Sequence, residues 1–106
     1  MEGRFMVVLC MFDLPVVTVQ DRRNYRKFKK FLDKEGFTML EESVYCRMVP
    51  SGGPLAAVRS ACRKNRPPRG LVLLLPITEK QFNNIEYLTG GYYSQVVISS
   101  DPVVVL

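Results

Sequence analysis

One acidic residue of this 106-residue chain, Asp13, lies at a position that is typical of functional groups. Asp13 directly follows an apolar run, residues 5–12, and precedes Leu14 and Pro15. A carboxylate at the end of a buried strand is held on rigid backbone, which is a common location for a functional group. The alternative is that Asp13 only accepts hydrogen bonds from the backbone of a turn. The residues alone leave both interpretations open.

A metal site at Asp13 would need a second chain. Mg²⁺ takes octahedral oxygen ligands and usually one or two carboxylates, so one aspartate per chain is a poor site. A twofold dimer would place two copies of Asp13 across one cleft and leave positions for a scissile phosphate. Ser43 is a candidate accessory hydroxyl. The same pair of carboxylates could instead share a proton.

The composition excludes several other mechanisms. Histidine is absent, which excludes Ser-His-Asp and Cys-His nucleophiles and an imidazole base. The cysteines Cys10, Cys46 and Cys62 form no CxxC pair, and their odd number without a signal peptide predicts a reducing cytoplasm. A divalent cation lowers the pKa of water and would replace the missing base. Residues 5–12 are too few to span a membrane, so no membrane partner is expected.

Positive charge is concentrated in two segments. The chain has 15 Lys and Arg against 10 Asp and Glu; residues 21–34 carry seven positive and two negative side chains, and residues 59–69 five positive and none negative. A charged run is often only a solvated helix face, but such a face usually mixes both signs. The bias here predicts a phosphate-binding surface. The predicted nucleic-acid-binding residues are Arg22, Arg23, Arg26, Lys27, Lys30, Arg63, Lys64 and Arg66.

The aromatic residues favour contact with a duplex backbone. At helical spacing Tyr25, Phe28 and Phe31 fall opposite the charges, which predicts that they belong to the core. The basic surface then suits sequence-independent phosphate contact better than reading of single-stranded bases. Tyr92 and Tyr93, in a glycine-rich stretch, could either stack on bases or pack internally.

The first half of the chain predicts a strand, a helix and an irregular extended stretch. Residues 5–12 are apolar at every position, as in a central strand buried on both faces. Thr18 and Asp21 form a capping-box pattern that opens a helix to about residue 35, with Gly36 just beyond it. Residues 37–49 are extended, and the alternation breaks near Glu41, which predicts a bend, a bulge or two short strands.

The second half of the chain predicts a helix that begins at Pro54 and whose buried side is formed by Leu55, Val58, Ala61 and Cys62. A strand over residues 70–75 is expected to follow. That strand should be buried on both faces and stopped by Pro76. Thr78 and Gln81 repeat the capping pattern before a short helix buried by Phe82, Ile85 and Leu88. The order predicts an α+β fold: a single domain, residues 1–106, built as a ferredoxin-like βαββαβ sandwich with an extra short helix.

The C-terminus predicts the oligomeric state. The chain ends in four aliphatic residues, Val103, Val104, Val105 and Leu106, which must be buried or will aggregate. A strand over about residues 96–106 could complete its own sheet or cross to the sheet edge of a second chain. We expect the exchanged homodimer.

Four motifs together resemble one family. They are residues 11–15 (MFDLP), residues 25–32 (YRKFKKFL) followed by EGF at 35–37, SVY at 43–45, and TEKQF at 78–82. In order and spacing they are similar to the CRISPR-associated endoribonucleases, the second of the two core Cas proteins of spacer acquisition. The last motif is most similar to members that accompany Cas9-type (type II) systems.

The resemblance implies a function for these residues. It implies a homodimer with crossed C-terminal strands, Mg²⁺ between two copies of Asp13, and endonuclease activity on RNA or DNA. It also implies that the dimer bridges two copies of the CRISPR integrase along the prespacer duplex. Two alternatives stay open: a non-catalytic DNA-binding scaffold, and a toxin-like RNA interferase on the same fold.

Overall fold

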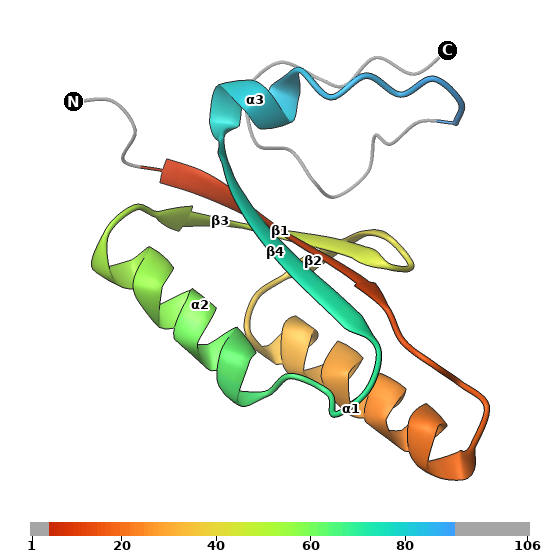
Figure 1. Ribbon diagram of the computed structural model, residues 1–106. Coiled ribbons are helices and arrows are strands. Elements are labelled where there is room, and N and C mark those ends of the chain that lie inside the picture. The colour runs from red at the N-terminus through yellow and green to blue at the C-terminus, as the bar shows by residue number, and fades with distance from the viewer. Residues whose placement is uncertain (1–4, 91–106) are drawn as a thin grey trace.

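The computed structural model describes residues 5–90, which form one four-stranded antiparallel sheet and three helices (Figure 1). The strand order is β2-β3-β1-β4. This arrangement confirms the predicted α+β class and is compatible with the ferredoxin-like fold. The predicted C-terminal strand and Tyr92 and Tyr93 lie outside the described residues. The elements are β1 Phe5–Asp13, α1 Val19–Lys34, β2 Thr38–Glu41, β3 Val44–Pro50, α2 Gly53–Lys64, β4 Leu71–Thr78 and α3 Glu79–Asn83.

Strand β1 is the centre of the sheet and is buried on both faces, as its unbroken apolar sequence predicts. Val8, Cys10 and Phe12 belong to the core under α1 and α2. Val7 and Leu9 point the opposite way and pack in a second cluster with Phe82 of α3. Figure 1 shows α1 and α2 on one face of the sheet and α3 on the other. Side-chain alternation along β1 therefore assigns each of its residues to one layer.

Helix α1 begins and ends where its local sequence predicts. The backbone N–H of Asp21 donates to Thr18 Oγ1 at 2.9 Å, and the N–H of Thr18 donates to Asp21 Oδ2 at 3.2 Å, which completes the capping box. Gly36 follows the helix with φ of 91°, a conformation that favours glycine. Phe28 and Leu32 are fully buried in the core.

The next two elements also follow the sequence. The extended stretch divides into two short strands, β2 and β3, and a register shift of the bulge type lies between Met39 and Glu41, so the structure contains both the predicted strand break and the predicted irregularity. Helix α2 has Pro54 in its first turn and buries Val58 and Cys62, while Leu55 packs partly buried against the same core.

Strand β4 corrects two predictions. Pro76 lies within the strand opposite Val8 and does not end it. Among the described strands β4 is an edge, so the nitrogen of Pro76 needs no ladder hydrogen bond on that side. The strand is also not buried on both faces, because Leu71, Leu73 and Leu75 are 55%, 48% and 46% exposed. These leucines alternate with inward-facing residues and share one face of the sheet.

Helix α3 corrects a third prediction. The capping box of Thr78 and Gln81 is present, but the helix ends at Asn83. Phe82 is buried as predicted, whereas Ile85 and Leu88 lie beyond the helix and are exposed. Within residues 5–90, no helix is both long and apolar enough to cross a membrane.

Candidate functional site

Asp13 is the last residue of β1 and is exposed. Its strand neighbour is Leu71, the first residue of β4. Since side chains alternate along a strand, Asp13 shares a face with Val7, Leu9 and Met11, and not with the residues that pack under α1 and α2. The carboxylate therefore lies at one end of the sheet face opposite the two long helices.

That sheet face carries a row of exposed apolar side chains. Register places the exposed residues of β3 and β4 opposite β1 residues on the same face of the sheet as Asp13. Each of these apolar side chains is at least 40% exposed. We call this surface the open sheet face; its members are Phe5, Met48, Leu71, Leu73 and Leu75.

The backbone around Asp13 is held from both sides. The N–H of Phe12 donates to the carbonyl of Ser43 at 3.0 Å. On the other side, Gly70 has φ of 97°, and a Cβ on it would lie 2.7 Å from the carbonyl oxygen of Asp13. Only glycine tolerates both the conformation and the close approach. The strand end is therefore a fixed support for the carboxylate.

The Ser43 hydroxyl, predicted as an accessory group, is engaged elsewhere. The Ser43 Oγ and its backbone N–H both donate to Glu41 Oε1 at 2.8 Å. These two bonds, the backbone one foremost, hold the pKa of Glu41 below its usual value. Ser43 is brought beside β1 through its carbonyl oxygen, whereas its hydroxyl stabilises the β2–β3 turn.

Among the described residues, Asp13 is a single carboxylate without a second metal-ligating group beside it. Within the described part of the chain, no three Cys, Asp or Glu side chains lie close enough together to hold a metal ion. The cysteines offer no alternative, because burial raises the pKa of Cys10 to about 12 and those of Cys46 and Cys62 to about 11. A hard cation such as Mg²⁺ at Asp13 needs further oxygen ligands beyond those that residues 5–90 of one chain place there.

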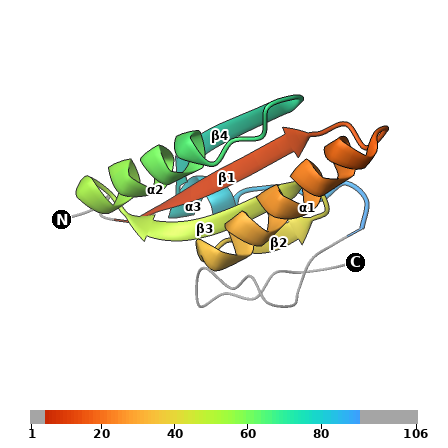
Figure 2. The same ribbon diagram turned by 90° about the horizontal axis from the view of Figure 1, so that it is seen from below.

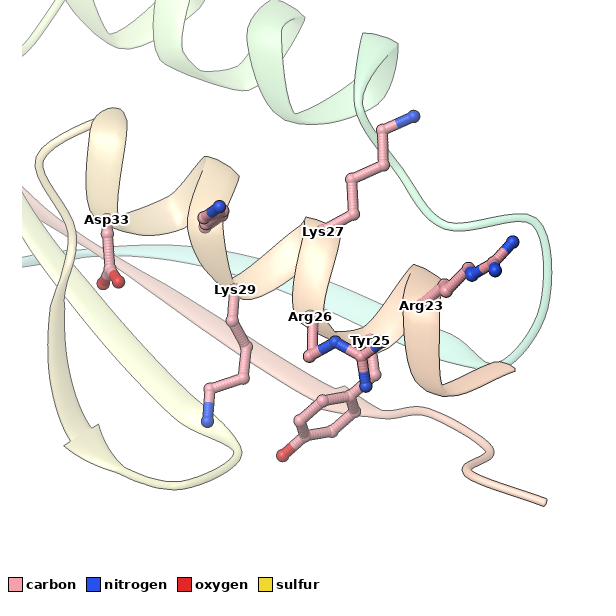
Figure 3. A pocket seen from close by; sticks show the side chains of 7 residues that line it. Arg23, Tyr25, Arg26, Lys27, Lys29 and Asp33 are labelled. Carbon is pink, nitrogen blue, oxygen red and sulfur yellow. The ribbon is translucent and has the colours of Figure 1, made fainter. Parts of the chain in front are cut away.

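The predicted basic residues of α1 are all exposed. Over α1 there is a surface depression of about 590 Å³, lined by five Lys or Arg side chains together with Tyr25 and Asp33. Figure 3 shows Tyr25 and Lys29 extending to the same side of the helix, and Lys27 to the other. We call the exposed cationic set the basic surface of α1; it consists of Arg22, Arg23, Arg26, Lys27 and Lys30.

The sequence did not predict Tyr25 and Lys29 as part of this surface of α1. Tyr25 was assigned to the core, and its ring does contact Phe12 edge-on at 6.4 Å. The ring is nevertheless only half-buried, and the Lys29 ammonium lies 5.2 Å from its centre. A position at the boundary between the apolar and charged arcs of the helix is the signal that could have indicated this.

One predicted phosphate ligand already has protein partners. The guanidinium of Arg22 donates to the carbonyls of Val16 at 3.2 Å and Val17 at 3.0 Å, so part of its donor capacity fixes the turn before α1. Its remaining N–H groups stay available to solvent or ligand.

The second basic segment follows α2. Arg63, Lys64 and Arg66 are exposed, and Arg66 donates to the carbonyl of Arg63 at 2.6 Å. Figure 2 shows α1 and α2 side by side over the same face of the sheet. Both predicted basic segments therefore lie in the helical layer, whereas Asp13 faces the opposite side of the sheet.

An ion pair between an exposed arginine and a buried aspartate joins the two basic segments. Asp21 of α1 has a side chain that is only 3% exposed, and its Oδ1 lies 2.9 Å from the Arg69 guanidinium. The Thr18 backbone N–H is the main group that holds the pKa of Asp21 below its usual value, and Arg69 adds to the effect. Sequence reasoning found the capping role of Asp21 but not its partner, since Arg69 lies 48 residues away.

Comparison with known proteins gives one family. The family model described as CRISPR associated protein Cas2 matches residues 6–85. A protein of Treponema denticola named CRISPR-associated endoribonuclease Cas2 is 39% identical over 101 residues, which cover 95% of this chain and all of that protein. Proteins of the same name from Streptococcus mutans (strain UA159) and Lacticaseibacillus rhamnosus are 38% and 37% identical, cover 95% of this chain, and are themselves covered to 93% and 100%.

Proposed function

The chain belongs to the Cas2 family of CRISPR-associated proteins, and from this we propose that it acts in spacer acquisition as a homodimeric endoribonuclease. In this proposal Asp13 of each protomer holds Mg²⁺, and the basic residues of both protomers bind duplex nucleic acid. The dimer also bridges the CRISPR integrase, in the cytoplasm.

The observation that carries the proposal is the position of Asp13 at the end of the open sheet face. An exposed row of leucines on a small domain favours association, because apolar surface is stabilised by removal from water. A second copy packed on this face by a twofold axis would bury Leu71, Leu73 and Leu75 of both chains. The same packing would bring two Asp13 carboxylates to one interface.

Two such carboxylates match the needs of a divalent cation. Bound Mg²⁺ would supply positive charge for a scissile phosphate and lower the pKa of a water molecule. The chain's own part is to fix each carboxylate on rigid backbone through Ser43 and Gly70. The chain also offers no accessible thiolate nucleophile and no imidazole base, because its three thiols are buried and it has no histidine.

The basic surface of α1 supports duplex binding. Its side chains are exposed and cationic, so they can pair with backbone phosphates of any sequence. In a dimer the surfaces of two protomers would extend along one duplex. Binding of this kind depends steeply on salt and little on sequence.

The direct test is the Asp13→Asn variant with single-stranded RNA and duplex DNA in the presence and absence of Mg²⁺. We expect loss of Mg²⁺-dependent cleavage by at least about a hundredfold, because loss of even an outer-shell metal partner costs about 10–100-fold in affinity or activity. Asn has nearly the same shape as Asp, so circular dichroism and dimer mass should be unchanged. Cleavage by the variant at the wild-type rate would place the activity elsewhere.

A second candidate, a scaffold without catalysis, has one observation in its favour. Asp13 and the basic surface of α1 face opposite sides of the sheet, so duplex binding needs no carboxylate. The scaffold predicts that Asp13→Asn supports spacer integration as well as wild type does. A toxin-like RNA interferase predicts instead RNA cleavage with no integrase recovered in a pull-down.

A further inference from the structure

One short stretch of chain, residues 69–71 at the start of β4, contacts both ends of the segment from Asp13 to Asp21. At its start, Asp13 pairs with Leu71 in the β1–β4 register. At its end, Asp21 Oδ1 accepts a hydrogen bond from Arg69 at 2.9 Å. Gly70 lies between these two contacts. The turn that follows Asp13 is therefore part of a closed ring of contacts.

Gly70 leaves no free space inside this ring. A Cβ at this position would lie 2.7 Å from the carbonyl oxygen of Asp13, 2.9 Å from Leu14 Cδ2 and 3.0 Å from Pro15 Cδ. Real Cβ atoms do not approach backbone oxygen so closely, and φ of 97° disfavours any side chain there. The backbone at residue 70 thus packs directly on the turn that carries Asp13.

Arg69 holds this packing in place. Its guanidinium is 63% exposed, yet its partner carboxylate is almost fully buried and also accepts the Thr18 N–H. Loss of Arg69 would leave this carboxylate without its cation and with the Thr18 N–H as its remaining partner, which weakens the ring at this end. Leu14, Pro15 and Pro67 line a small depression of about 10 Å³ beside the pair.

We propose that Arg69 is a positioning residue for Asp13: it ties α1 to the segment that packs on the turn, and so fixes the direction of the Asp13 carboxylate. The inference rests on the proposed function, in which two copies of Asp13 hold a divalent cation. Arg69 belongs by sequence to a basic run, and its guanidinium also forms an ion pair with Asp21.

Mn²⁺ binding to the intact protein, followed by electron paramagnetic resonance without nucleic acid, tests the inference. Arg69→Gln should weaken Mn²⁺ binding about tenfold, the usual effect of removing a group that orients a metal ligand. Arg59→Gln on α2 is the matched control, because it removes the same charge at a residue outside the ring and outside the predicted nucleic-acid-binding set. It should bind as wild type does, and Arg69→Lys should recover most of the loss.

Gly70→Ala tests the same ring from its other side and should also weaken Mn²⁺ binding. Should that variant not fold, Asp21→Asn replaces it, since it keeps the shape of the side chain and removes the charge. Wild-type Mn²⁺ affinity in Arg69→Gln would overturn the inference.

Two further measurements separate failure of this inference from failure of the proposed function. If Asp13→Asn binds Mn²⁺ like wild type, the metal site is elsewhere and both are overturned. If Asp13→Asn abolishes binding and Arg69→Gln does not weaken it, only the positioning role is overturned. Amide hydrogen exchange over residues 13–18 should accelerate in Arg69→Gln but not in Arg59→Gln, and unchanged exchange would contradict the ring.

Discussion

One chain supplies the whole basic surface of α1, but it supplies only one of the two carboxylates proposed to meet at the Asp13 end of the sheet. Asp13 is a single carboxylate on fixed backbone, at the edge of an apolar face that remains exposed in one protomer. The basic surface has five exposed cations on one helix, and one chain supplies all of them. A site built from one group per protomer needs dimerisation to exist, whereas a surface of many charges only gains affinity from it. Changes that affect association should therefore separate the two regions.

The largest expected effect comes from Leu73→Glu in the open sheet face. A symmetric interface would bury this charge twice, so dimer dissociation should rise at least about a thousandfold. Sedimentation velocity should show a monomer that has lost Mg²⁺-dependent cleavage but still binds duplex weakly. Val17→Glu is the matched control, since Val17 is 81% exposed and lies outside the open sheet face. A dimeric Leu73→Glu protein would place the interface elsewhere.

Charge reversal on α1 should affect the other region alone. The triple variant Arg23→Glu, Arg26→Glu and Lys30→Glu should weaken duplex binding about a hundredfold at 0.1 M salt, because it removes three phosphate contacts. Each lost contact should also reduce the slope of log affinity against log salt concentration by about 0.9. Arg22 is left intact because it fixes the turn before α1. Lys80→Glu on α3, on the opposite side of the sheet, is the control and should bind normally. Equal loss in the control would indicate a net-charge effect and not a defined surface.

Asp21→Asn acts where the two regions meet and should have a smaller effect, lowering the melting temperature by roughly a few degrees at pH 7. The folded-state pKa of Asp21 is lowered, so the stability from its ionised form is present above the pKa of the unfolded carboxyl. It is lost as the pH falls through the folded-state value. The gap in melting temperature between wild type and variant should therefore close below about pH 4. A gap that stays constant from pH 7 to pH 3 would show that the charge of Asp21 contributes nothing.

Ser43→Ala should have the smallest effect. The hydroxyl donates to the Glu41 carboxylate and supports the β2–β3 turn, so cleavage should stay within about twofold of wild type, as expected for an exposed substitution away from the reacting groups. Steady-state cleavage of RNA with Mg²⁺ measures this. A drop as large as that of Asp13→Asn would assign Ser43 to the reaction.

Local rules predicted the parts of the fold that depend on neighbouring residues. The capping boxes at Thr18 and Thr78 and the turn at Gly36 each need only a few adjacent residues, and all three are present. Asp13 was predicted at a strand end for the same reason. The predicted exposure of Arg23, Arg26 and Lys30 followed from helical periodicity alone.

The errors concern contacts that a linear pattern does not define. The apolar residues of β4 predicted burial on both faces, but a sequence cannot tell burial by the chain's own helices from burial by a second chain. The sequence predicts that Pro76 ends the strand, whereas proline is tolerated there because β4 is an edge among the described strands. The pair of Asp21 and Arg69 was missed because 48 residues separate its members.

The stoichiometry of Mn²⁺ binding to the purified protein tests most directly whether two chains build one metal site at Asp13. Titration followed by electron paramagnetic resonance should give one cation bound for every two chains, lost in Asp13→Asn and in the monomeric Leu73→Glu variant. One cation bound to each chain, or undiminished binding by the monomer, would contradict the account.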